Sequence, residues 1–153
     1  MNKIKKIRNP KSEIRNQKTL CPVILPVPEE VKAYKPRDRV RFLSEHARKA
    51  LALCAQKCGI DLGELKQDDK GVPIPFDGIY WSVTHKNEYA GAVLSSQPVG
   101  IDIEKIQPCS RGLFRKTASD AEWALADQPQ DEFTLFYRYW TAKEAVVKTS
   151  TAG

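Results

Sequence analysis

Two acidic residues, Asp102 and Glu104, alternate with apolar residues in the stretch 99–104, which reads Val-Gly-Ile-Asp-Ile-Glu. This alternation predicts a strand with both carboxylates on one face and their Cα atoms roughly 7 Å apart. Like charges side by side repel each other, and a divalent cation such as Mg²⁺, which prefers carboxylate oxygens, would offset the repulsion. Gly100 has no side chain, so the same face is open to a ligand. Two solvated acids on a half-buried edge strand are the alternative interpretation.

A third carboxylate, Glu144, lies on a helix predicted over residues 132–149. At 100° per residue it falls in the middle of a narrow apolar stripe, which consists of Phe133, Phe136, Tyr137, Trp140 and Val147. An ionised carboxylate is costly on such a face unless it is paired or binds a metal. Lys148 follows one turn later, so a Glu144–Lys148 ion pair is the alternative to a metal ligand. With Asp102 and Glu104 there are three carboxylates, which suits Mg²⁺ shared between a protein and substrate phosphates.

The elements that must position these residues are those of an α+β domain. Apolar runs predict strands at 23–25, 79–84, 89–95 and 99–104. Helical periodicity predicts helices at about 37–58, 113–117, 119–127 and 132–149. Gly59 is the expected end of the first helix, and Ser119 with Glu122 forms a capping box at the start of the third. The short break before 99–104 predicts that this strand pairs antiparallel with the strand before it.

Composition and charge restrict the classes of function. The chain is 41% hydrophobic and 29% charged, as is ordinary for a globular protein. The net charge of +6 comes from residues 1–20, which hold seven Lys and Arg against Glu13. The rest is near neutral, so nucleic acid is not expected as a partner, and a nucleic-acid-binding arm at 1–20 is the weaker alternative. The four cysteines have no metal-binding spacing and no apolar run is long enough for a membrane span, so a cytoplasmic protein is expected.

Two motifs together resemble the paired signature of the 4′-phosphopantetheinyl transferases. The first is 99–104, and the second is 140–148, which reads Trp-Thr-Ala-Lys-Glu-Ala-Val-Val-Lys. A third segment, 81–85, reads Trp-Ser-Val-Thr-His and is similar to one that precedes the first signature in the surfactin-synthetase-activating type. The resemblance covers roughly residues 37–153. It implies the fold of that family, an antiparallel sheet packed with helices in two pseudo-two-fold halves.

The resemblance also implies a reaction. The family transfers the 4′-phosphopantetheine arm of coenzyme A to a serine of an apo acyl or peptidyl carrier protein and releases adenosine 3′,5′-bisphosphate. Asp102, Glu104 and Glu144 match its Mg²⁺ ligands, and the pyrophosphate of coenzyme A would complete the shell. The serine is a weak nucleophile, so Glu144, directly or through a water, is the candidate base. Lys148, on the same face as Glu144, is a candidate catalytic residue that contacts a phosphate.

Further residues match expected contacts to coenzyme A. His85 matches the histidine that contacts the 3′-phosphate, although its position alone would indicate an ordinary turn histidine. The full set of expected contacts is Arg48, Lys49, Thr84, His85, Lys143 and Lys148. Within this set, Lys143 lies about 100° from Glu144 on the helix and is expected at the substrate rim or in solvent. Glu122 matches an acidic residue that some members carry between the signatures.

Two departures from the family pattern bear on activity. Val72 stands between Gly71 and Pro73, where the family has a basic residue, so one phosphate contact is missing. Lys70 and Lys86 are the candidate substitutes. After residue 148 the family continues through a Gly-rich turn into more strands, whereas this chain stops at residue 153.

We therefore expect a disordered basic tail at 1–20, a first pseudo-half at 21–98 and a truncated second pseudo-half at 99–153 that carries the metal-binding motifs. An inactive fragment that only binds coenzyme A or the carrier protein is the alternative to an active enzyme. The sequence leaves open the choice between monomer and dimer.

Overall fold

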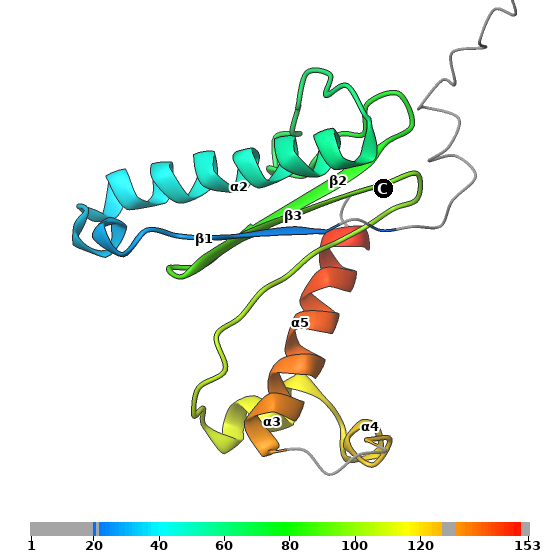
Figure 1. Ribbon diagram of the computed structural model, residues 1–153. Helices are drawn as coiled ribbons and strands as arrows, with labels where there is room; N and C mark the ends of the chain where they lie inside the picture. The colour runs from blue at the N-terminus through cyan, green and yellow to red at the C-terminus, as the bar shows by residue number, and fades with distance from the viewer. Residues whose placement is uncertain (1–19, 21, 127–130, 151–153) are drawn as a thin grey trace, which may run out of the picture.

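The computed structural model describes residues 20, 22–126 and 131–150, and it has a three-stranded antiparallel sheet packed with helices (Figure 1). The strands are β1 (Val23–Pro26), β2 (Tyr80–His85) and β3 (Tyr89–Ser95). The helices are the 3₁₀ helix η1 (Glu29–Ala33), α2 (Pro36–Cys58), α3 (Arg111–Thr117), α4 (Asp120–Trp123) and α5 (Glu132–Ser150). The α+β class is thereby confirmed. The expected tail at 1–20 lies, apart from Leu20, outside the described residues.

Strand β3 is the centre of the sheet, in the order β1-β3-β2. Ala92 of β3 lies opposite Val23 of β1 on one side and Val83 of β2 on the other. The β2–β3 hairpin closes with a hydrogen bond of 2.8 Å from the Lys86 N–H to the carbonyl oxygen of Tyr89. The predicted strands at 23–25, 79–84 and 89–95 are therefore confirmed to within about a residue.

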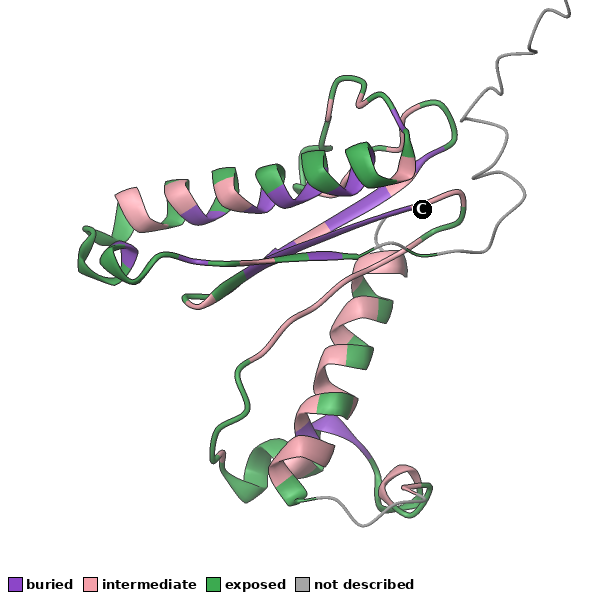
Figure 2. Ribbon diagram, viewed as in Figure 1, coloured by how far each residue is buried: buried purple, intermediate pink, exposed green. Residues whose placement is uncertain are grey.

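Helix α2 covers one face of the sheet, and the main core lies between them. In Figure 2 the buried stretches of α2 and of the strands face each other. Ala50, Leu51 and Cys54 of α2 pack there with Trp81 of β2. The Trp81 indole donates a hydrogen bond of 3.0 Å to the Ile74 carbonyl, so its polar edge is satisfied. The helix ends at Gly59, whose φ of 64° is left-handed, as predicted.

The opposite face of the sheet receives the segment 99–104. Alternate residues of β2 point away from α2, so Ser82 and Thr84 are buried on this second face. The Ser82 hydroxyl accepts a hydrogen bond of 3.2 Å from the Ile101 N–H. In Figure 1 this segment leaves the sheet and descends beside α5.

The prediction that 99–104 is a strand paired antiparallel with β3 is wrong for the described structure. The segment has no regular secondary structure because side chains, instead of a neighbouring strand, bond its backbone. The Ile101 carbonyl accepts from Lys148 Nζ at 2.8 Å, and the Ile101 N–H is bonded to a hydroxyl. The alternation of faces survives, since Ile101 approaches Gly91 of β3 while Asp102 and Glu104 line a common pocket.

Helix α5 extends away from the sheet, and the two short helices pack at its N-terminal end (Figure 1). Phe114 of α3 lies 4.8 Å, centroid to centroid, from Phe136, which is 2% exposed. Trp123 of α4 packs against Tyr139 with the ring centroids 4.6 Å apart and the ring planes tilted by 47°. Among the helices in the described part of the chain, none combines the length and the apolar character needed to cross a bilayer.

Gly100 brings segment 99–104 into direct contact with the backbone of α5. A Cβ atom at Gly100 would collide with the carbonyl oxygen of Ala145 and lie 2.8 Å from its carbonyl carbon. The neighbour is helix backbone, which has no rotamer to change. The absence of a side chain at Gly100 is therefore required for this approach.

We expect Gly100→Ala to destabilise the protein by about 1–3 kcal/mol or more, because the added methyl forces the segment off the helix. Urea unfolding followed by circular dichroism measures this. Gly112→Ala is the matched control: its Cβ would have no neighbour closer than 3.8 Å, and alanine favours the helical interior of α3. Equal unfolding midpoints for the two variants would show that the close approach is not required.

Candidate functional site

A pocket of about 370 Å³ lies where β2, segment 99–104 and α5 meet. It is lined by Val83, Thr84, His85, Lys86, Asp102, Glu104, Trp140, Glu144 and Lys148. All three acids that the sequence singles out are in this set. The pocket also collects three of the predicted coenzyme A contacts, Thr84, His85 and Lys148.

Helix α5 supplies its part of the pocket from one ridge. Phe136, Trp140, Glu144 and Lys148 follow one another at intervals of four residues, so they lie one turn apart on one side of the helix. Phe136 is buried against α3, whereas the other three line the pocket. The predicted apolar stripe is thus real around Glu144, with one exception: Val147 is 53% exposed because α3 and α4 contact only the other end of α5.

Asp102 has a deeply buried side chain, which is 6% exposed compared with 18% for Glu104. Its Oδ1 accepts hydrogen bonds from Lys148 Nζ at 2.8 Å and from Thr84 Oγ1 at 3.2 Å. Its Oδ2 is buried and has no hydrogen-bond partner among the described residues. A buried carboxylate oxygen without a donor is energetically unfavourable, so a cation at this point would remove a deficit of the protein itself.

Glu104 faces a lysine of the β2–β3 turn. Its Oε1 lies 2.7 Å from Lys86 Nζ. The hydrogen bond that Lys86 donates to Glu104 raises the pKa of the Lys86 ammonium above its usual value, and the negative charges of Glu104, Asp102 and Glu144 act in the same direction. Lys86 is therefore close enough to all three carboxylates to be influenced by each of them.

The carboxylates line one pocket without converging on one point. Within residues 20, 22–126 and 131–150, no three Asp, Glu, His or Cys side chains are close enough to hold a metal ion as they stand. The lysine contacts account for this, because Lys86 holds Glu104 and Lys148 holds Asp102. The donor set itself, three carboxylates with one buried unpaired oxygen, is of the kind that Mg²⁺ prefers.

His85 ends β2 at the side of the pocket, where it is half-buried. Burial lowers the pKa of its imidazole, and the positive charges of Lys148 and Lys86 lower it further. His85 is therefore neutral at neutral pH in the ligand-free protein. An incoming anion such as a phosphate would favour the protonated form.

The remaining predicted contacts lie outside this pocket. Arg48 and Lys49 are exposed on α2 and do not line it, so they would meet only a ligand that extends beyond it. Lys143 is exposed and ion-paired with Glu122 at 2.6 Å. Its position agrees with the expectation of a rim or solvent-facing lysine.

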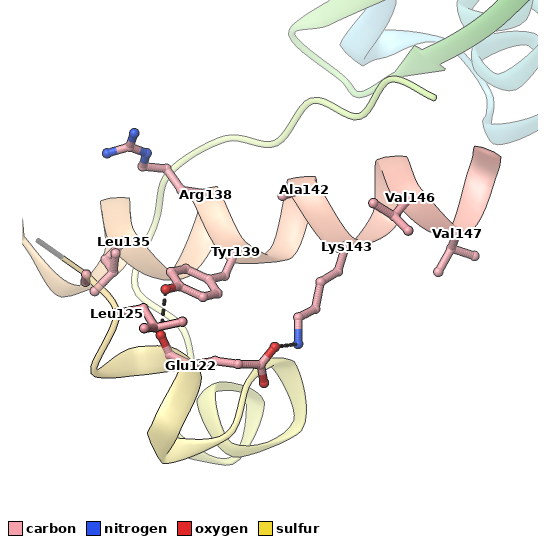
Figure 3. Close-up of a pocket in the computed structure, with 10 residues that line it drawn as sticks. Glu122, Leu125, Leu135, Arg138, Tyr139, Ala142, Lys143, Val146 and Val147 are labelled. Atoms are coloured by element: carbon pink, nitrogen blue, oxygen red, sulfur yellow. Dashed lines mark hydrogen bonds and ion pairs between the residues drawn. The ribbon is translucent and has the colours of Figure 1, made fainter. Parts of the chain in front are cut away.

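Glu122 and Lys143 belong to a second, larger pocket of about 760 Å³ between α4 and α5, shown in Figure 3. The capping box of Ser119 and Glu122 is present, as predicted. The contact with Lys143, together with the Ser119 hydrogen bonds, lowers the pKa of Glu122 to about 2. The Tyr139 hydroxyl donates a hydrogen bond of 2.6 Å to the backbone carbonyl oxygen of Glu122. Glu122 therefore connects α4 to α5 through its backbone, which bonds Tyr139, and through its side chain, which pairs with Lys143.

Sequence reasoning gave Lys86 no place beside the carboxylates and named it only as a substitute phosphate contact. The missing information was three-dimensional. Lys86 follows His85 in a hairpin turn, and the direction of its side chain toward Glu104 depends on where segment 99–104 crosses the sheet. A basic residue next to the predicted phosphate-binding histidine was the available signal.

Comparison with known proteins identifies relatives of this chain. Residues 98–153 match the model of the 4′-phosphopantetheinyl transferase superfamily. The chain is 31% identical over 133 residues to the 4′-phosphopantetheinyl transferase HetI of Nostoc. The aligned region covers 78% of this chain and 55% of HetI. It is 30% identical over 76 residues to the 4′-phosphopantetheinyl transferase Sfp of Bacillus subtilis, and this aligned region covers 48% of this chain and 34% of Sfp.

A third relative is the 4′-phosphopantetheinyl transferase AcpT of Salmonella typhimurium, 33% identical over 94 residues that cover 57% of this chain and 49% of AcpT. The chain thus spans from about a third to a little over half of the length of these curated relatives. The matched family region contains Asp102, Glu104 and Glu144 together with Lys148. Residues 98–153 of this chain thus match the 4′-phosphopantetheinyl transferase superfamily, and the chain is similar to several curated 4′-phosphopantetheinyl transferases.

Proposed function

We propose that the pocket between β2, segment 99–104 and α5 transfers the 4′-phosphopantetheine arm of coenzyme A to a serine of an apo acyl or peptidyl carrier protein. The observation that carries this proposal is the gathering of Asp102, Glu104 and Glu144 around one pocket, with Asp102 Oδ2 buried and unpaired among the described residues. The family match supplies the reaction class. We also propose that residues 21–98 and 99–153 correspond to the two pseudo-two-fold halves of the family fold.

Asp102, Glu104 and Glu144 are the proposed ligands of Mg²⁺. Bound there, Mg²⁺ would neutralise charge on the pyrophosphate of coenzyme A and on the leaving phosphate. The Asp102 oxygen without a donor is the natural first ligand, since it gains an interaction without losing one. Lys148 remains beside it as a second positive charge toward the phosphates.

The transfer step needs a nucleophile, a base and a leaving group. The serine Oγ of the carrier protein forms a bond to the phosphorus next to the pantetheine, and the bond from this phosphorus to the bridging oxygen breaks. Adenosine 3′,5′-bisphosphate takes the electron pair of the broken bond and leaves. Glu144 accepts the serine proton, directly or through a water, because it lines the pocket from α5 beside the other two acids.

Thr84 and His85 at the end of β2 form the proposed coenzyme A side of the pocket. The Thr84 hydroxyl bonds Asp102, which fixes the distance between the coenzyme A side and the metal side. His85 takes up a proton as the 3′-phosphate binds, since its pKa is depressed in the free protein. Lys143, which is exposed and paired with Glu122 outside this pocket, is a proposed contact for the approaching carrier protein.

Binding without turnover is a second candidate function. It is favoured by the lysine contacts of Glu104 and Asp102, since no three possible metal ligands among the described residues are close enough together to hold an ion as they stand. The two candidates differ in one assay with coenzyme A, Mg²⁺ and an apo carrier protein. Transfer adds the mass of the arm to the carrier protein, whereas binding alone leaves that mass unchanged while the chain still retains coenzyme A.

We expect Glu144→Gln to lower the transfer rate by at least about 100-fold, because the change removes a metal ligand and the base together. Mass spectrometry of the carrier protein over time measures the rate. Glu132→Gln is the matched control on the same helix, since Glu132 pairs with Arg111 away from the pocket. A rate for Glu144→Gln within a few-fold of the control would contradict the assignment.

We expect His85→Gln to weaken binding of adenosine 3′,5′-bisphosphate by about tenfold at pH 6 and by less at pH 8. The pKa of His85 is lowered in the free protein, so its charged form becomes available only as the pH falls. Titration calorimetry at both pH values measures this, with adenosine 5′-monophosphate as the ligand that lacks the 3′-phosphate. His46→Gln, at the other histidine, is the control, because His46 bonds Pro26 outside the pocket. An equal loss for both nucleotides would argue against a 3′-phosphate contact.

A further inference from the structure

Two lysines of the chain offset most of the negative charge of the carboxylates in the pocket. The residues that line it include three carboxylates and two ammonium groups, those of Lys86 and Lys148. The two lysines reach the acids by different routes. Lys148 is carried by α5 and bonds both Asp102 and the Ile101 carbonyl, so it is part of the framework that holds segment 99–104.

Lys86, in contrast, enters from a turn and reaches the carboxylates with its side chain alone. Its backbone is fixed by the hydrogen bond to Tyr89, while its side chain is 44% exposed. The Glu104 carboxylate that it meets is 18% exposed. The ammonium can therefore leave this contact for water by rotations of its own side chain, without a change in the fold.

A neighbouring ion pair shows what is particular to Lys86. Lys105 and Glu88 also join segment 99–105 to the hairpin turn, at 3.4 Å, with side chains that are 63% and 28% exposed. That pair does not line the pocket. Lys86 differs because it lines the pocket together with the three carboxylates, and its ammonium lies 2.7 Å from Glu104 Oε1.

We propose that Lys86 is an exchangeable counter-ion that occupies the place of the divalent cation in the metal-free protein and must leave Glu104 before the metal binds. This inference rests on the metal-binding part of the proposed function. It explains why the three carboxylates line one pocket but do not converge, since Glu104 is held by Lys86 and Asp102 by Lys148. It also explains how the metal-free site stays assembled despite three negative charges.

Exchange has a measurable consequence for metal affinity. A cation that enters the pocket must displace an existing ion pair and meets a positive charge nearby, so Lys86 lowers the affinity for any divalent ion. Removing its charge while keeping its length should raise the affinity. Half-exposed ion pairs are weak, and the expected gain is about fivefold at low salt.

The experiment compares the binding of Mn²⁺ alone to the full chain and to two variants, Lys86→Met and Lys105→Met, by titration calorimetry and by electron paramagnetic resonance of free Mn²⁺. We expect Lys86→Met to bind Mn²⁺ about fivefold more tightly than the wild type, and Lys105→Met to remain within twofold. The gain should shrink at high salt, where the charge of Lys86 is screened. Circular dichroism and the urea midpoint establish that each variant is folded.

Equal or weaker Mn²⁺ binding by folded Lys86→Met than by Lys105→Met would overturn the exchange. No binding of Mn²⁺ by any of the three proteins would instead overturn the metal part of the proposed function, so the two failures are distinguishable. A second measurement does not need a variant. The side-chain ammonium signal of Lys86 in nitrogen-edited NMR of the wild type should shift when Mg²⁺ is added, and an unchanged signal at saturating Mg²⁺ would refute the exchange.

Discussion

Asp102 is a carboxylate with a side chain only 6% exposed, and much of the local structure compensates for the removal of its charge from water. An isolated ion at such a depth would be neutralised or would unfold its surroundings. Lys148 and Thr84 supply donors to one oxygen, and these two residues belong to different elements, α5 and β2. The hydrogen bonds to this one oxygen of Asp102 thus join α5 to the sheet.

The same junction depends on side chains that replace a β-ladder. The segment 99–104 lies on the face of the sheet opposite α2, where Ser82 and Thr84 present hydroxyls to it. Hydroxyl hydrogen bonds hold a chain in place without requiring it to run alongside a strand edge. This leaves the carboxylates of Asp102 and Glu104 on the side of the pocket instead of within a hydrogen-bonded sheet.

Local patterns were sufficient to predict most elements, because those elements are determined by neighbours in the sequence. The apolar stripe of α2 with Gly59 at its end, the capping box at Ser119 and the two strands on either side of Lys86 all follow from local spacing. The position of Glu144 in an apolar stripe indicated that its charge needs a partner, either Lys148 or a metal ion, and the structure places Glu144 in one pocket with Asp102, Glu104 and Lys148. The assignment of 99–104 as a strand failed because alternation reports two faces, not a hydrogen-bonded neighbour. The meeting of Lys86 with Glu104 and the position of Arg48 outside the pocket depend on how the elements cross, which spacing does not encode.

The contact of Gly100 with the Ala145 carbonyl ties segment 99–104 to α5, so the pocket is built from two parts. One part, formed by the segment and α5, carries Asp102, Glu104 and Glu144. The other part is the β2–β3 hairpin, which carries Thr84, His85 and Lys86. A small tilt of α5 against the sheet would then preserve the spacing among the acids and change only their distance to the hairpin. The two parts are joined across the pocket by the hydroxyl bonds of Ser82 and Thr84 and by the Lys86–Glu104 ion pair. Loss of the ion pair would leave the two hydroxyl hydrogen bonds as the remaining links among these. A cation that displaces Lys86 from Glu104 would therefore also weaken the connection between the two parts of the pocket.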